Sequence, residues 1–141
     1  MIGARATLAS ARRQEERDEH AEKIALRGAA RLVWMDLAIC DSNLEWAATR
    51  RRWSGAAEMI PITAWESHAN LLAAGIEDGQ RWEAVVNAMA ALEQLHMRMD
   101  ARWAGELNDA IVHSLTDARQ HVLKAAAVLR EDAGLPPTST G

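Results

Sequence analysis

The stretch WEAVVNAMAALEQLHMRMDARW, residues 82–103, decides the fold. Its apolar side chains recur alternately three and four residues apart, and His96 fills the one gap in the series. This spacing is typical of a helix that packs lengthwise against other helices. We therefore expect a buried seam on this helix, made of Trp82, Val85, Met89, Leu92, Met99 and Trp103.

A second series with the same spacing lies earlier in the chain and predicts one long helix that ends near Trp53. The cationic residues Arg50, Arg51 and Arg52 suit the negative end of the helix dipole there. We expect the packing seam of this helix to consist of Ala25, Gly28, Leu32, Met35, Ile39, Ser42, Trp46, Thr49 and Trp53. Its neighbours Val33, Leu37, Cys40 and Leu44 widen the apolar stripe toward the other helices.

Two further helices complete the set. Pro61 disfavours helix before it, and Thr63 with Glu66 reads as a capping box that begins a short helix. Asn108 or Asp109 is expected to cap the last helix, and Gly134 is expected to end it in a left-handed turn.

The sequence thus predicts an all-α fold, an antiparallel up-and-down four-helix bundle with a long, overhanging first helix. Residues 1–22 are polar and charged and have almost no apolar stripe, so we expect a charged helical extension or a disordered arm. Residues 23–134 form the bundle in this interpretation, and residues 135–141 form a disordered tail.

Composition agrees with a single helical domain and excludes several classes of protein. The 141 residues are 49% hydrophobic and rich in Ala, with six Trp and no Phe or Tyr. Cys40 is the single cysteine, so an internal disulfide is excluded and a buried thiol is expected. No apolar run approaches the roughly 20 residues of a membrane span, and no signal peptide is visible. We therefore expect a cytoplasmic protein.

Helix lengths predict a tryptophan-rich end of the bundle. Counting about 1.5 Å per residue places Trp53, Trp65 and Trp103 together, with Trp46 slightly below them. A structural plug is the usual role of such a cluster. With the arginines beside it, the cluster is also our candidate interaction surface, made of Arg50, Arg51, Arg52, Trp53, Trp65 and Trp103.

One metal-binding pattern is present in part. Glu93 and His96 form an E-x-x-H pair, which carboxylate-bridged di-iron bundles use twice together with two further glutamates. The chain has only one such pair, and His96 falls on the predicted seam. Glu93 and His96 are therefore weak metal candidates, and we predict no catalytic residue and no cofactor.

Nucleic-acid binding would depend on a first group of arginines near the N-terminus or on Arg50, Arg51 and Arg52. The formal net charge of −4 argues against a general nucleic-acid binder. Acidic residues between the arginines reduce their attraction for phosphate. The first group consists of Arg5, Arg12, Arg13, Arg17 and Arg27.

The segments PITAWESHANLLA, residues 61–73, and WEAVVNAMAALEQL, residues 82–95, carry a resemblance to a family. Together they resemble a group of uncharacterised helical proteins from high-GC actinobacteria, over roughly residues 30–103. In that group a long helix ending in Arg and Trp precedes a turn, a short helix and a W-x-x-V helix. The resemblance implies a scaffold or interaction role and no known activity.

The function predicted from these observations is a non-enzymatic helical protein–protein interaction or scaffold module. Self-association through the first helix or its overhang is one form of this prediction, so the partner is either another protein or a second copy. Two alternatives stay open: a metal- or small-ligand-binding bundle at Glu93 and His96, and a weak nucleic-acid association through the N-terminal arginines.

Overall fold

The computed structural model describes residues 2–53, 59–98 and 105–136, and it is helical over most of them. Residues 52–53 and 105–106 form a small antiparallel ribbon, in which Arg52 is paired with Glu106 and Trp53 with Gly105. The elements in chain order are α1 (Ile2–Arg50), β1 (Arg52–Trp53), α2 (Thr63–Gly75), α3 (Gly79–Arg98), β2 (Gly105–Glu106) and α4 (Asp109–Asp132).

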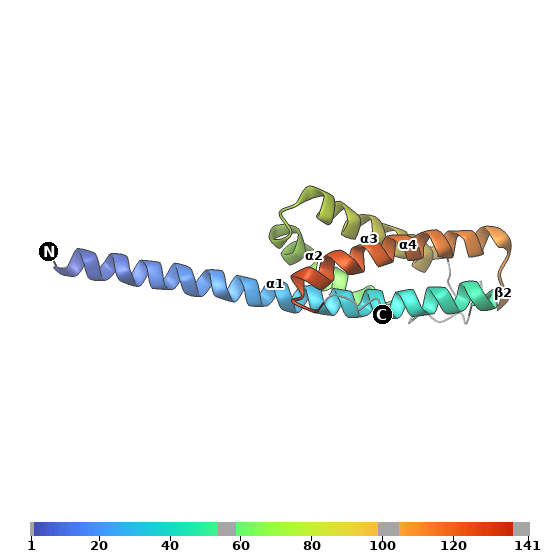
Figure 1. Ribbon diagram of the computed structural model, residues 1–141, viewed down its shortest axis with the longest axis horizontal. Helices are drawn as coiled ribbons and strands as arrows, with labels where there is room; N and C mark the ends of the chain where they lie inside the picture. The colour runs from blue at the N-terminus through green and yellow to red at the C-terminus, as the bar shows by residue number, and fades with distance from the viewer. Residues whose placement is uncertain (1, 54–58, 99–104, 137–141) are drawn as a thin grey trace.

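The four helices form a bundle in which consecutive helices alternate in direction (Figure 1). α4 packs against both α1 and α3, and the short α2 lies on α1. Ion pairs confirm the antiparallel fit of α1 and α4, because Arg51 pairs with Asp109 at one end and Arg119 pairs with Asp41 near the middle. The predicted all-α bundle with a long first helix is confirmed.

The core lies between α1, α3 and α4, and it corrects the seam expected for the first helix. α1 turns inward a second series with the same three-and-four spacing, while Leu32, Met35, Ile39 and Trp46 are exposed. The buried series, which we call the inward face of α1, consists of Ala30, Val33, Leu37, Cys40, Leu44 and Ala47.

The seam of α3 is confirmed in its central part. Met89 and Leu92 are buried as expected, together with Val85, Ala88 and Leu95. Trp82 is half-buried. The helix ends at Arg98, and the predicted seam residues Met99 and Trp103 lie outside the described residues.

The cap of α2 comes from a different helix than predicted. The Thr63 and Glu66 capping box does not form, and no side chain at the preceding residue caps the helix. Instead, Asp36 on α1 accepts a hydrogen bond from the backbone N–H of Ala64 through Oδ2, at 3.2 Å. A carboxylate near the first turn satisfies an otherwise unpaired N–H and suits the positive end of the helix dipole. The cap therefore also fixes α2 on α1.

The ends of α4 follow the sequence prediction. The Asn108 side chain accepts from the Ile111 N–H at 2.9 Å, as an N-cap does. After the helix, Gly134 adopts a φ of 68°, and the Leu135 N–H bonds back to the Arg130 carbonyl at 3.1 Å. Glycine pays no steric cost in this left-handed conformation, so the helix ends here, and the following Leu135 packs against the core.

The end of the α1–α2 connector lies along α1 itself. Asn43 donates a hydrogen bond to the Met59 carbonyl at 2.9 Å, and the Cys40 thiol donates to the Pro61 carbonyl at 3.6 Å. The chain has thus returned from the end of α1 at Arg50 to Asp36, about fourteen residues earlier in the helix, where α2 begins. α2 lies against the middle of α1 for this reason and does not start at the end of the bundle.

The N-terminal half of α1 projects far beyond the other helices (Figure 1). The helix has 49 residues, and at a rise of about 1.5 Å per residue it is about 74 Å long. Every residue from 4 to 25 is exposed, so we call this part the overhang. Among the residues that the structure describes, no helix has a long enough apolar segment to cross a membrane.

Candidate interaction surface

The most distinctive surface of the molecule is the face of α1 that points away from the bundle. We call it the outward stripe and define it as Leu32, Met35, Ile39, Ser42, Trp46 and Thr49, all of which are exposed. Their spacing alternates between three and four residues, as in the seam of a coiled coil. The four large apolar members have 47%, 54%, 46% and 43% of their surface exposed, in chain order.

The outward stripe differs from the other exposed apolar residues of the described chain. Val86, Met97 and Leu123 are exposed singly on α3 and α4, as are Leu8 and Ile24 on the overhang, and single exposed apolar residues are common in folded proteins. The stripe instead aligns four large side chains along one face of one helix over about 21 Å. Such an alignment is typical of a surface that packs against another helix.

Charged side chains flank the outward stripe on both edges. The edge toward α4 carries Arg31, whose Nε donates to the Ala133 carbonyl at 3.1 Å, and Glu45, whose carboxylate accepts from Arg119 at 3.3 Å. The edge toward α2 carries Asp36, which caps α2, and Arg50, two heptads further on. Each edge therefore holds one cation and one anion.

Trp46 and Arg50 form the most structured part of the outward stripe. The Arg50 guanidinium lies 5.9 Å from the centre of the Trp46 ring, within the range of a cation–π interaction. A shallow hollow of about 280 Å³ lies beside them and is lined by Ser42, Glu45, Trp46, Thr49 and Arg50. Arg50 is thus the one predicted interaction arginine that lies at the edge of the exposed apolar face.

The other predicted residues near the end of α1 are held within the fold. Arg51 adopts a φ of 53°, forms an ion pair with Asp109, and its carbonyl accepts from the Leu107 N–H at 2.8 Å. Arg52 is exposed in β1, and Trp53 is only 3% exposed. These contacts give Arg51 and Trp53 a structural role in joining the ends of α1 and α4.

Trp53 and Trp65, the two described members of the expected tryptophan cluster, lie apart. Trp65 packs against Trp82, with ring centres 5.6 Å apart and ring planes inclined by 31°. This pair lies beside the start of α2, near Asp36, whereas Trp53 lies at the end of α1, about 21 Å further along by helix rise. The prediction is wrong for Trp53 and Trp65 because the connector runs back along α1. Trp103 lies outside the described residues.

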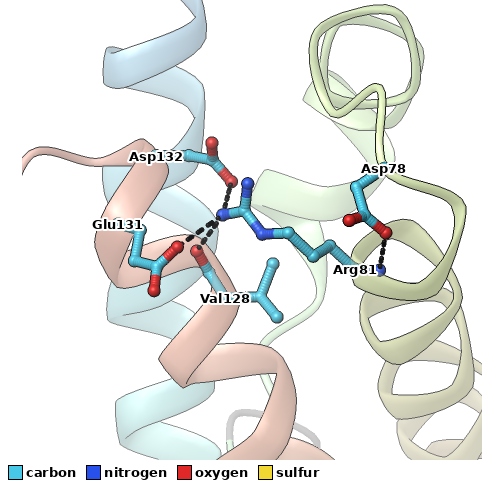
Figure 2. Close-up of polar contacts among 5 residues, drawn as sticks. All are labelled: Asp78, Arg81, Val128, Glu131 and Asp132. Atoms are coloured by element: carbon cyan, nitrogen blue, oxygen red, sulfur yellow. Dashed lines mark hydrogen bonds and ion pairs between the residues drawn. The ribbon is translucent and has the colours of Figure 1, made fainter.

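Arg81 connects α3 with the end of α4 (Figure 2). Its Nη2 donates to the Val128 carbonyl at 3.1 Å and to Asp132 at 3.0 Å, and it lies 3.2 Å from a Glu131 oxygen. Burial raises the pKa of Asp132 above its usual value; the positive charge of Arg81 opposes this shift and the negative charge of Glu131 adds to it. The cluster is fully engaged in joining two helices, which gives it a structural role.

The weak metal candidates do not form a ligand set in the structure. Glu93 is exposed, and His96 is half-buried on the same helix. Within residues 2–53, 59–98 and 105–136, no three His, Cys, Asp or Glu side chains gather closely enough to hold a metal ion.

Two further groups singled out in the sequence have clear positions. Cys40 is buried on the inward face of α1, and burial, with a smaller effect from the nearby negative charge of Asp36, raises the pKa of its thiol to about 12. The N-terminal arginines Arg5, Arg12, Arg13 and Arg17 are exposed on the overhang, with acidic side chains between them.

In comparisons with protein-family models, with curated proteins and with solved structures, nothing matches the chain. The resemblance to actinobacterial helical proteins therefore stays a prediction.

The outward stripe was visible in the sequence as a series of apolar residues, but the spacing was attributed to the interior. The flanking residues Arg31, Asp36 and Glu45 were missed, although counting one position beside each seam residue would have found them.

Proposed function

We propose that this chain is a non-enzymatic helical interaction module, in which the outward stripe of α1 binds a helix of another protein molecule. The observation that carries the proposal is a helix with two apolar faces. The inward face is covered by the bundle, whereas the outward stripe exposes Leu32, Met35, Ile39 and Trp46 at coiled-coil spacing.

Energetic reasoning supports this role. Covering apolar surface contributes about 25 cal/mol per Å², and four large side chains in one row offer a continuous area for it. α1 is already held as a helix by the bundle, so binding does not have to order this segment. The charged edges add selectivity for a partner helix of matching charge pattern.

Site-specific crosslinking tests the proposal. A benzophenone amino acid is introduced at Met35 on the outward stripe and, as a control, at Met97, which is 75% exposed on α3. In cells that make the protein, we expect crosslinked adducts of defined mass from position 35 and few from position 97. Equal labelling at both positions, or none at position 35, would contradict the proposal.

The other functions predicted from the sequence stay predictions. Glu93 and His96 stay a hypothesis for metal binding, which elemental analysis of the purified protein tests directly. The cytoplasmic location and the weak nucleic-acid association through N-terminal arginines also stay predictions, and a gel shift at low salt tests the latter.

A further inference from the structure

The side chains of the outward stripe indicate which helix it binds. This inference rests on the interaction function proposed above. If two copies of α1 lie side by side in parallel and in register, each stripe residue meets its own counterpart. Leu32, Met35, Ile39 and Trp46 then form apolar layers, and Ser42 and Thr49 form polar layers on either side of Trp46. A parallel pair therefore does not place an apolar side chain opposite a polar one.

The flanking charges are complementary to those of a second copy. In a parallel two-stranded coiled coil, a residue on one edge faces the residue five positions further along on the opposite edge of the other helix. Arg31 then faces Asp36 of the second copy, and Glu45 faces Arg50. Twofold symmetry repeats both pairs, and no like charges are opposed on these edges.

An antiparallel pair fits less well. Edge residues would then face the same edge of the other copy, so Arg31 would meet Glu45 and Asp36 would meet Arg50. The charges alone therefore fit both orientations. The antiparallel layers, however, would combine Leu32 with Thr49 and Ile39 with Ser42, which mixes apolar with polar side chains, and only the layer of Met35 with Trp46 would be apolar on both sides.

The overhang distinguishes the two orientations. In a parallel pair the two overhangs lie beside each other, where the same spacing places Arg17 opposite Glu22 of the second copy and also places Asp18 opposite its own counterpart, so attraction and repulsion offset each other there. In an antiparallel pair centred on the stripe, the overhangs would point in opposite directions and remain solvated. The bundle covers the inward face of α1 and leaves the stripe residues exposed, so the stripe of a single chain is accessible in either arrangement.

We propose that the outward stripe of α1 is a homodimer interface, in which two copies of the chain pair in parallel and in register through residues 32–49. The dimer then has a central coiled coil, with one bundle on each outer side and the two overhangs emerging together at one end.

Sedimentation velocity and sedimentation equilibrium at about 1–100 µM give the first test. We expect the wild-type chain to sediment at twice its mass of 15.5 kDa. Ile39→Glu places a charge at the centre of the interface and should give the monomer mass with unchanged helical circular dichroism. A wild-type chain that remains monomeric over this range overturns the proposal.

Disulfide crosslinking tests the orientation. Met35→Cys brings two thiols together only in the parallel register, since the antiparallel pair separates them by about 16 Å along the axis. Met97→Cys is the matched control on an exposed part of α3, and the native Cys40 stays buried in both variants. We expect an oxidised dimer from Met35→Cys alone. A dimer by sedimentation without this crosslink overturns the parallel register.

Charge reversal gives an independent test in which mixing restores the interface. Glu45→Arg and Arg50→Glu each oppose like charges in their own homodimer, and we expect each to weaken it about 3- to 10-fold. An equimolar mixture should form a heterodimer with all pairs attractive again, and so recover the wild-type affinity. In an antiparallel dimer the mixture would retain repulsive pairs, so a mixture without recovery contradicts the proposal.

These results separate this inference from the proposed function. A monomeric chain whose position 35 crosslinks to a different protein rejects the homodimer and keeps the interaction module. A monomeric chain that crosslinks to nothing at position 35 rejects both.

Discussion

The two faces of α1 have the same spacing of apolar residues and opposite surroundings. The inward face consists of smaller side chains and is almost completely buried against the bundle. The outward stripe has larger side chains, among them Met35 and Trp46, and is about half exposed. Coiled-coil spacing therefore shows that a face is suited to packing, but it does not show whether the partner lies within the chain or outside it.

Side-chain size differs between the two faces of α1. Ala30 and Ala47 on the inward face are fully buried, and small side chains allow neighbouring helices to approach closely. Close approach increases the number of dispersion contacts between the helices. Large side chains on the other face remain available for a second interface, where the geometry is not already fixed by the rest of the chain.

The largest expected change in stability comes from truncating a residue on the inward face, and a matched truncation on the outward stripe gives the comparison. Leu37→Ala should reduce the free energy of unfolding by about 2–5 kcal/mol, because it leaves a cavity in a fully buried site. Ile39→Ala, a matched change on the outward stripe, should cost less than about 1 kcal/mol in dilute protein. Urea unfolding at several protein concentrations measures both.

Concentration separates the two faces in the same experiment. The effect of Leu37→Ala should not depend on protein concentration, whereas the effect of Ile39→Ala should grow as concentration rises and dimers form. If Ile39→Ala were as destabilising as Leu37→Ala in dilute protein, Ile39 would belong to the interior of the single chain, and the comparison of the two faces would fail.

The next largest change in stability is expected at the contacts of Arg81 with Val128, Glu131 and Asp132, which join α3 to α4. Arg81→Met should reduce the free energy of unfolding by about 1–3 kcal/mol, because it removes charge-assisted hydrogen bonds and leaves Asp132 partly buried without its cation. Arg98→Met, at the exposed end of the same helix, is the control and should change it by less than about 0.5 kcal/mol.

The same pair of variants predicts a pH dependence with a definite sign. The folded-state pKa of Asp132 is raised above the ordinary value of 3.8, so the folded state holds this proton more tightly than the unfolded state. The contribution of Asp132 to stability is therefore present at low pH and decreases as the pH rises from 3.8 to the raised pKa. Arg81→Met removes a charge that lowers this pKa, so the decrease should extend to higher pH. An NMR titration of the Asp132 carboxyl that shows a lower pKa in Arg81→Met would contradict this.

Much of the fold could be predicted because its signals are local. Asn108 and Gly134 act on neighbouring backbone groups; Gly134 is predicted as the end of the helix, and Asn108 is one of the two caps that the sequence predicts. The position of α2 could not be predicted, because its cap is Asp36 on a distant helix and its connector runs back along α1. For the candidate site, the residues of the stripe were recognised but their direction was not, since spacing is the same on both faces.

Smaller changes in stability are expected at the N-terminus of α2, where they distinguish the observed cap, Asp36, from the predicted cap, Thr63. Asp36→Ala should destabilise the fold by about 0.5–2 kcal/mol, because the Ala64 N–H loses its acceptor. Asp36→Asn keeps an oxygen in place and should recover most of this. Thr63→Ala changes the residue that local sequence favours as the cap and should have little effect, because the Thr63 side chain is exposed. Urea unfolding of dilute protein compares the three, and a larger cost for Thr63→Ala would restore the local capping box.

The smallest effect is expected on the overhang, which has apolar residues but no repeated apolar stripe. Leu8 is 65% exposed, so Leu8→Ser should change the free energy of unfolding of dilute protein by less than about 0.5 kcal/mol.

Hydrogen exchange should distinguish the overhang from the packed part of α1. Amides of residues 4–25 should exchange much faster than those of residues 29–47, because no packing of the single chain protects them. If dimerisation brings the overhangs together, protection of residues 4–25 should rise with protein concentration in the wild type and stay low in Ile39→Glu. Strong protection of residues 4–25 in that monomeric variant would show that the overhang is stabilised within one chain, and the contrast between the bundle and the overhang would be lost.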